Sequence, residues 1–165
     1  MSNYLILCVD DEREVLDSVL QDLSDFEDHF IVEGAESAEE AKKVIEDYQN
    51  EGTNLALILC DHIMPNQTGV SFLIELNDDD KYKSVRKVLL TGQAGHDDTI
   101  EAVNHSSLDF YIAKPWSGKQ LRQVVTQQLT EYMIANEKNL APWATVLDTE
   151  KIFNALSANR MSFGE

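Results

Sequence analysis

The chain has 165 residues and a hydrophobic content of 43%, which is enough for one folded domain with a short appendage and excludes global disorder. Its formal net charge is −17, so duplex DNA and anionic membrane surfaces would repel it, and we expect the chain to bind neither. Neither a stretch of about 18 apolar residues nor a basic leader followed by an apolar run occurs, so we expect a soluble, cytoplasmic protein.

Five short apolar runs are the candidate strands of the domain. In chain order they are Tyr4–Val9, Phe30–Val32 with its flanks, Leu55–Cys60, Val88–Thr91 and Phe110–Ala113. Short apolar runs alone do not separate a buried strand from a buried helix, so the segments between them decide. The two cysteines, Cys8 and Cys60, lie inside these runs, and we expect both to be buried, reduced thiols.

A segment of helical periodicity follows every run. The positions that recur at this spacing are, in order, Val15, Leu16, Val19, Leu20 and Leu23; Ala41, Val44, Ile45 and Tyr48; Val70, Phe72, Leu73 and Leu76; Ile100 and Val103; and Leu121, Val124, Val125, Gln128, Leu129 and Tyr132. Ser37 with Glu40, and Ser117 with Gln120, form capping boxes ahead of the second and fifth segments. This alternation predicts an α/β fold of the flavodoxin-like (βα)5 type, a doubly wound parallel sheet in the strand order 2-1-3-4-5.

Residues that can carry chemistry stand at the ends of four runs. Asp10 and Asp11 follow the first run, Asp61 the third and Lys114 the fifth, and Thr91 ends the fourth. Ligands of an open parallel sheet bind beyond the carboxyl ends of its strands, and the predicted order makes the first and third strands neighbours, so the three carboxylates should converge. Oxygen ligands without histidine or thiolate favour Mg²⁺. A carboxylate nucleophile, a metal, a cation and a hydroxyl together indicate phosphoryl transfer to an aspartate.

Each residue also has a simpler explanation when it is taken alone. Asp10 and Asp11 could cap the first helix, while Thr91 and Lys114 could be a surface hydroxyl and a solvated charge. His62 is the neighbour of the central aspartate, but a residue beside a strand end need not face the site, so we interpret it as a bystander. The convergence of all the other residues on one sheet edge favours a shared site.

The chain resembles the receiver domain of bacterial two-component response regulators over residues 3 to 130. The resemblance rests on the order and spacing of Asp10–Asp11, Asp61 with the MPNQTG stretch after it, Thr91 and Lys114–Pro115. The resemblance implies that Asp61 is the phosphoacceptor. It also implies that the phosphoryl donor is a phosphohistidine on a sensor histidine kinase or on a phosphotransfer protein.

The resemblance further implies a Mg²⁺ site. Asp11 would be the direct ligand, Asp10 would act largely through water, and Asp61 and the backbone carbonyl of Ile63 would complete the ligand set.

The remaining roles implied by the resemblance concern the switch. Lys114 would pair with Asp61 at rest and with a phosphoryl oxygen afterwards, and Thr91 would hydrogen-bond that oxygen. Tyr111 sits where the family keeps its switch aromatic, and the Lys114–Pro115 bond is expected to be cis.

These roles describe a phosphorylation-dependent signalling switch. The face formed by the fourth helix, the fifth strand and the fifth helix would change shape and control a downstream effector protein or domain. Such a chain phosphorylates and dephosphorylates itself and is not a turnover enzyme.

Two functions of other classes share part of this pattern. A flavodoxin-like electron carrier would share the fold, but the DDERE stretch after the first run would repel a flavin phosphate. The alternative is an aspartyl-phosphate-forming, Mg²⁺-dependent phosphohydrolase, whose catalytic groups overlap with these. Such an enzyme would usually carry a second acid two residues after its nucleophile, where this sequence has Ile63, and a cap domain that we do not expect here.

Residues 131–165 form a predicted helical extension of the domain at residues 1–130. The last helix could continue through Glu131–Leu140, Pro142 would stop it, and a second helix from about Thr149 could bury Ile152, Phe153 and Leu156. The extension would be a dimerisation element or a linker to a missing effector. We expect it to fold back on the domain and also to support a homodimer, because its apolar surface exceeds what one helix end can cover.

Overall fold

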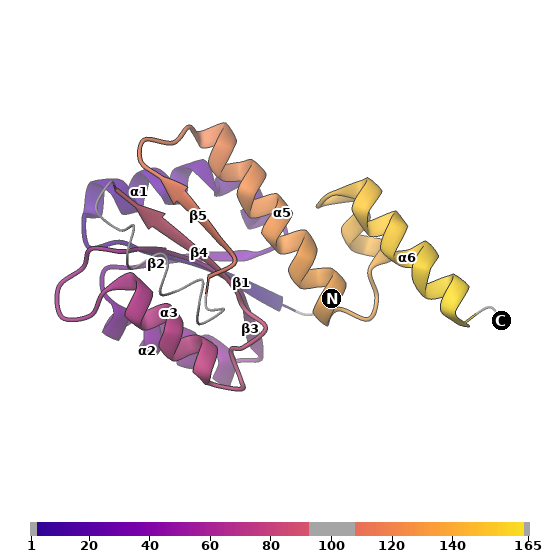
Figure 1. Ribbon diagram of the computed structural model, residues 1–165, viewed down its shortest axis with the longest axis horizontal. Coiled ribbons are helices and arrows are strands. Elements are labelled where there is room, and N and C mark those ends of the chain that lie inside the picture. Colours follow the sequence, from indigo (N-terminus) through magenta and orange to yellow (C-terminus); the bar gives the residue numbers. More distant parts are fainter. Residues whose placement is uncertain (1–2, 93–107, 164–165) are drawn as a thin grey trace.

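The computed structural model describes residues 3–92 and 108–163. Within these residues the chain forms a parallel five-stranded sheet in the order β2-β1-β3-β4-β5, which confirms the predicted fold class and strand order (Figure 1). The strands are β1 (Asn3–Val9), β2 (Ile31–Ala35), β3 (Thr53–Asp61), β4 (Arg86–Thr91) and β5 (Phe110–Ala113). The predicted fourth helical segment, with Ile100 and Val103, lies outside the described residues.

The helices of the described segments alternate with the strands. They are α1 (Arg13–Asp22), α2 (Ala38–Asn50), α3 (Gly69–Asp78), α5 (Gly118–Asn136) and α6 (Thr149–Phe163), with short 3-10 helices η1 (Ser24–Asp28) and η2 (Ala141–Thr145). Both predicted capping residues act as caps: the Ser37 and Ser117 hydroxyls accept hydrogen bonds, each of 3.0 Å, from the backbone N–H groups of Glu40 and Gln120. None of the helices in the described parts of the chain is long and apolar enough to cross a membrane.

Helices cover both faces of the sheet, and each face has its own hydrophobic core. Figure 1 shows α1 and α5 on one side of the sheet and α2 and α3 on the other. Cys8 belongs to the core under α1 and α5, whereas Cys60 belongs to the core under α2 and α3, so the two thiols are buried on opposite faces of neighbouring strands and remain unpaired. Burial raises the pKa of Cys8 to about 12, which keeps this thiol protonated at neutral pH.

The helix α5, the last one packed on the sheet, ends at Asn136, four residues before the predicted end at Leu140. The backbone of Glu137 is extended, with φ −97° and ψ 129°, and its carboxylate accepts a hydrogen bond of 2.5 Å from the Tyr4 hydroxyl. The side chain of Asn136 donates to the carbonyl of Tyr132 at 2.9 Å. The hydrogen bond between Glu137 and Tyr4 of β1 turns the chain back toward the sheet before Pro142.

The extension is seated on the domain by a buried tryptophan. Trp143 of η2 is 1% exposed, and its ring centroid lies 5.8 Å from that of Tyr4 and 5.3 Å from that of Phe30. These three aromatic residues belong to the same core as α1 and α5. The short helix η2 therefore closes the end of the sheet that lies opposite the carboxyl ends of the strands.

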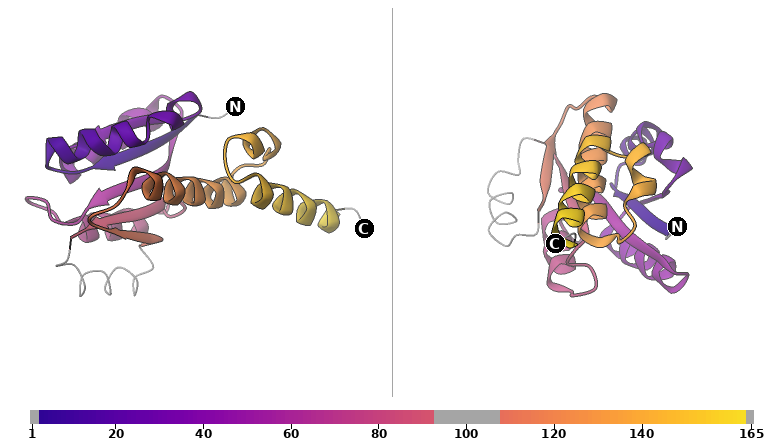
Figure 2. Two further views of the ribbon diagram at one scale, coloured as in Figure 1. Left: turned by 90° about the horizontal axis from the view of Figure 1, so that it is seen from above. Right: turned by 90° about the vertical axis from the view of Figure 1, so that its right-hand side faces the viewer.

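The helix α6 lies at the end of α5 that points away from the sheet (Figure 2), and polar contacts join the two helices. The Lys151 ammonium pairs with Glu131, and the backbone N–H of Asp148 donates to the buried Thr130 hydroxyl at 3.2 Å. Ile152 is fully buried, but Phe153 is 54% exposed, so the prediction that Phe153 is buried was wrong. Successive helical residues point about 100° apart, and with Ile152 directed into the core its neighbour faces solvent.

Candidate functional site

The three predicted carboxylates meet at the carboxyl ends of β1 and β3. These strands pair in register, with Val9 opposite Cys60, so the residues that follow them lie side by side. One carboxylate oxygen from each of Asp10, Asp11 and Asp61 lies within 4.8 Å of the others. Asp10 and Asp61 are buried, and Asp11 is exposed at the mouth of the pocket.

Burial makes this pocket electrostatically unfavourable as it stands. Burial is the largest cause that raises the pKa of Asp10 to about 6, with smaller contributions from the charges of Asp61 and Asp11. A hydrogen bond of 2.9 Å from the backbone N–H of Glu12 and the charge of Lys114 oppose this shift. The pKa of Asp61 is also raised by burial, although the Lys114 ammonium opposes that shift. The pocket therefore carries negative charge that the protein compensates only in part.

The donor set fits a hard divalent cation. Asp10 Oδ2 is buried and has no hydrogen-bond partner among the described residues, so this oxygen is left for a ligand. The converging side-chain ligands are all carboxylate oxygens, and one of the three is open to solvent, which suits an ion that keeps several of its waters. A cation here would also relieve the repulsion between the carboxylates.

The predicted cation and hydroxyl flank the central aspartate. Lys114 directly follows β5, where its backbone N–H donates to the carbonyl of Thr91 at 2.8 Å, and the Lys114–Pro115 bond is cis, as predicted. Lys114 Nζ lies 3.4 Å from Asp61 Oδ1. The Thr91 hydroxyl is nearly buried and donates to the carbonyl of Gly92 at 2.9 Å rather than to Asp61.

The two other predicted residues lie outside this cluster of side chains. Ile63 is in the loop between β3 and α3, and its side chain is 64% exposed. The role of its backbone carbonyl as a Mg²⁺ ligand stays a prediction. Tyr111 is on the edge strand β5, and its side chain is 52% exposed, in an outward position.

Two residues shape the loop after Asp61, and one of them, Gly69, was not predicted to matter for the site. Gly69 donates its N–H to the carbonyl of His62 at 2.8 Å, and a Cβ at Gly69 would lie only 2.2 Å from the Asp61 carbonyl oxygen. Only glycine allows this approach, and the glycine that closes the MPNQTG stretch was the available signal. His62 is buried, and its Nδ1 accepts a long hydrogen bond of 3.4 Å from the N–H of Val70. It thus braces the loop, in line with the bystander interpretation.

The buried Lys87 near the start of β4, at the other end of the strand from Thr91, was not predicted either. Lys87 is 1% exposed, and its ammonium donates to the carbonyls of Val85 at 2.7 Å and Tyr82 at 3.1 Å. Burial lowers its pKa to about 8. Because it lies at the other end of the strand from Thr91, Lys87 stabilises the connection from α3 to β4 and takes no part in the acidic pocket.

Comparison with known proteins identifies the class. The family model for the response regulator receiver domain matches residues 6–126. The hydrogenase transcriptional regulatory protein HoxA of Bradyrhizobium diazoefficiens is 32% identical over 139 residues, which cover 82% of this chain and 26% of the relative. The response regulator Rre1 of Synechocystis sp. is 30% identical over 132 residues, which cover 80% of this chain and 54% of the relative. The chain thus spans about a quarter and about half of the length of these two proteins.

Solved structures agree on the fold. The signal receiver domain of an HD domain-containing protein from Pseudomonas fluorescens superposes with a TM-score of 0.72 at 22% identity, covering 84% of this chain and 96% of that chain. A CheY-like response regulator receiver domain protein from Methanospirillum hungatei gives a TM-score of 0.67 at 28% identity, covering 79% of this chain and 97% of that chain.

The chain belongs to the receiver domains of bacterial two-component response regulators. Receiver domains are phosphorylation-dependent signalling switches, are in general not turnover enzymes, and bind Mg²⁺ at an acidic pocket. In this chain Asp10, Asp11 and Asp61 form a cluster of carboxylates at the carboxyl ends of β1 and β3.

Proposed function

We propose that Asp61 accepts a phosphoryl group from a phosphohistidine of a sensor histidine kinase or phosphotransfer protein. The observation that carries this proposal is the position of Asp61, nearly buried, between two further carboxylates and the Lys114 ammonium at 3.4 Å. A carboxylate oxygen of Asp61 forms the new bond to phosphorus, the phosphorus–nitrogen bond of the donor breaks, and its electron pair returns to the imidazole.

Mg²⁺ would be held by Asp11 directly, by Asp10 largely through water, and by Asp61 and the Ile63 carbonyl. When bound, the ion neutralises charge on the transferred phosphoryl oxygens. Lys114, whose ammonium lies 3.4 Å from Asp61 Oδ1, would contribute a second positive charge and orient the attacking carboxylate.

The signal would leave the site through Thr91, Lys114 and Tyr111. Phosphorylation adds about 1.5–2 negative charges and new acceptor oxygens at Asp61. The Thr91 hydroxyl exchanges the Gly92 carbonyl for a phosphoryl oxygen, and Lys114 shifts to the same group. Tyr111 turns inward from its exposed position, and the face of the fourth helix, β5 and α5 changes shape for a downstream effector protein or domain. We place this switch in the cytoplasm, where its kinase would act.

Asp61 phosphorylation is tested with a small donor. Incubation with acetyl phosphate and Mg²⁺ should add one phosphoryl group, seen by intact-mass spectrometry and lost in mild base. Asp61→Asn should abolish the adduct, and Lys114→Ala should slow its formation by about tenfold or more, since it removes a charge-assisted contact to the transferred group. An adduct of full stoichiometry in Asp61→Asn would contradict the assignment.

The metal site gives a second expected result. Asp11→Asn should weaken Mg²⁺ binding by about tenfold or more in calorimetric titration, because one charge and one direct ligand disappear together. Glu12→Gln is the matched control, since Glu12 is an exposed neighbour of equal charge that lies outside the cluster. Equal Mg²⁺ affinities of wild type and Asp11→Asn would show that Asp11 is not a ligand.

A further inference from the structure

The Lys114 ammonium is close to two groups of different kinds. Its Nζ lies 3.4 Å from Asp61 Oδ1 and 6.0 Å from the ring centroid of Trp116, the second residue after it in the chain. An aromatic ring attracts a cation that lies over its face within about 6 Å of the centroid. The indole ring and the Asp61 carboxylate therefore both act on this ammonium.

The carboxylate alone holds Lys114 weakly. The Lys114 side chain is 34% exposed, and 3.4 Å is longer than the 2.7–2.9 Å or so that is usual for a charge-assisted hydrogen bond. Within residues 3–92 and 108–163 the Lys114 ammonium makes no second ion pair. An exposed pair restrains a flexible lysine side chain only slightly, so a further group is needed to keep its ammonium beside Asp61.

A hollow next to Lys114 offers its ammonium other partners. The hollow encloses about 400 Å³ and is lined by Lys114, Trp116 and residues of α1, which include the exposed Glu14 and the half-buried Asp22. The carboxylates of Glu14 and Asp22 would attract an ammonium that had left Asp61. The lysine therefore has a competing position on the α1 side of the hollow.

The ring of Trp116 is itself fixed by packing. It is half-buried and packs on the hydrophobic core under α1 and α5, so it cannot follow the lysine into solvent.

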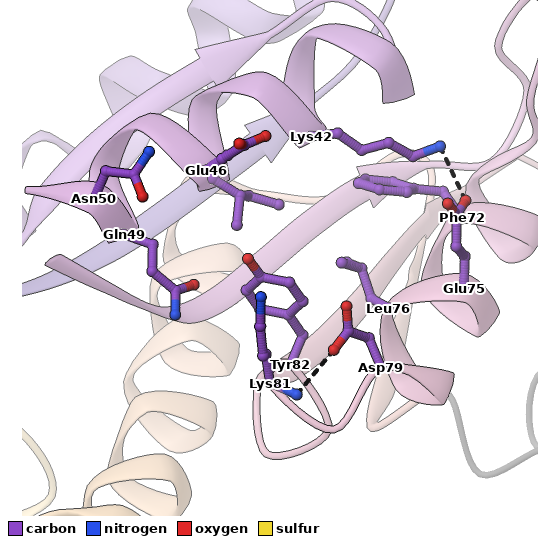
Figure 3. A pocket seen from close by; sticks show the side chains of 11 residues that line it. Lys42, Glu46, Gln49, Asn50, Phe72, Glu75, Leu76, Asp79, Lys81 and Tyr82 are labelled. Carbon is purple, nitrogen blue, oxygen red and sulfur yellow. Dashed lines mark hydrogen bonds and ion pairs between the residues drawn. The ribbon is translucent and has the colours of Figure 1, made fainter. Parts of the chain in front are cut away.

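The chain holds another lysine with an acid and a ring together. In the groove between α2 and α3 (Figure 3), the Lys42 ammonium pairs with Glu75 at 3.0 Å and lies 5.8 Å from the ring centroid of Phe72. Lys114, with Asp61 and Trp116, has the same combination of partners at the acidic pocket.

We propose that Trp116 is a positioning residue for phosphoryl transfer to Asp61. Its ring keeps the Lys114 ammonium beside Asp61 and away from the carboxylates of α1, so the positive charge is in place when the phosphoryl group arrives. Among aromatic side chains indole attracts a cation most strongly, which suits tryptophan for this role. The inference rests on the proposed function of Asp61.

The contact itself is tested by NMR of the metal-free, unphosphorylated chain labelled with ¹³C in its lysine side chains. Protons over the face of an aromatic ring are shifted upfield, so the Lys114 CεH₂ signal, assigned by its loss in Lys114→Arg, should lie upfield of the signals of solvated lysines. Trp116→Leu should return it to the solvated position, whereas Trp116→Phe should keep part of the shift. A Lys114 signal that is the same in wild type and Trp116→Leu would overturn the proposal.

The role in transfer is tested by the rate of phosphorylation with acetyl phosphate and Mg²⁺. Trp116→Leu should slow the reaction by about two- to fivefold, as expected for the loss of a cation–π contact at a partly exposed site, and Trp116→Phe should restore most of the rate. In the Lys114→Ala background Trp116→Leu should have no further effect, because the ammonium that the ring positions is gone. Phe153→Leu, which removes an exposed aromatic ring of the extension, is the matched control and should leave the rate unchanged.

The outcomes separate this inference from the proposed function. Trp116→Leu with the wild-type rate, or with an equal slowing in the Lys114→Ala background, would overturn the positioning role while Asp61 remains the phosphoacceptor. A wild-type chain that acquires no phosphoryl group at Asp61 would overturn the proposed function, and the positioning role with it.

Discussion

Replacing Trp143 by alanine should lower the free energy of unfolding of the domain by about 3–5 kcal/mol, the range for a large aromatic residue removed from a core. Trp143 is 1% exposed and packs against Tyr4 of β1 and against Phe30, so its loss leaves a cavity at the end of the sheet. Urea denaturation followed by far-UV circular dichroism measures the change.

Phe153→Ala is the control for this prediction. Phe153 is an aromatic residue of the same extension, but it is 54% exposed, and its removal should change stability by no more than about 0.5 kcal/mol. If Trp143→Ala leaves the unfolding of the sheet unchanged, residues 131–165 are an independent appendage. A single cooperative transition that shifts with Trp143 would instead support our proposal that the extension folds with the receiver domain.

The second large effect concerns pH and the acidic pocket. The pKa of Asp10 is about 6 in the folded protein and near 3.8 in an unfolded chain, so the folded state holds this proton more tightly. The stability that this group contributes is fully present below about pH 4, is lost as the pH rises through about 6, and amounts to about 3 kcal/mol. Asp61, whose pKa is also raised, acts in the same direction.

Asp10→Asn should therefore stabilise the metal-free protein at pH 7 by up to about 3 kcal/mol and have little effect at pH 4. The amide keeps the acceptor for the Glu12 N–H and removes the charge. Asp25→Asn, at an exposed position in η1, is the control. Thermal unfolding of wild type and both variants at pH 4 and pH 7, with and without Mg²⁺, measures these differences in stability. Equal stabilities of Asp10→Asn and wild type at pH 7 would show that the charge of Asp10 is already compensated.

The strand ends were the part of the molecule that could be predicted best from the sequence. Parallel strands bring their carboxyl ends to one edge, so Asp10, Asp61 and Lys114 could be placed together from strand order alone. The capping roles of Ser37 and Ser117 could also be predicted, because a helix cap depends only on residues close together in the sequence.

Features that depend on contacts between distant segments could not be predicted in this way. The end of α5 is set by the Tyr4 hydroxyl, which lies 133 residues away from Glu137 along the chain. The need for glycine at Gly69 arises from the approach of the Asp61 carbonyl, and the groove between α2 and α3 exists only once the two helices are packed side by side. Local patterns do not encode such distances, since tertiary contacts set them.

The central claim, that Asp61 is the phosphoacceptor, is tested most directly by locating the phosphoryl group on the chain. Borohydride reduces an aspartyl phosphate to homoserine, and peptide mass spectrometry then identifies the converted residue. After treatment with acetyl phosphate and Mg²⁺, we predict homoserine at position 61 and unmodified aspartates at positions 10 and 11. Conversion at position 10 or 11 in place of 61, or conversion at none of the three positions in a sample that carries the adduct, would contradict this account.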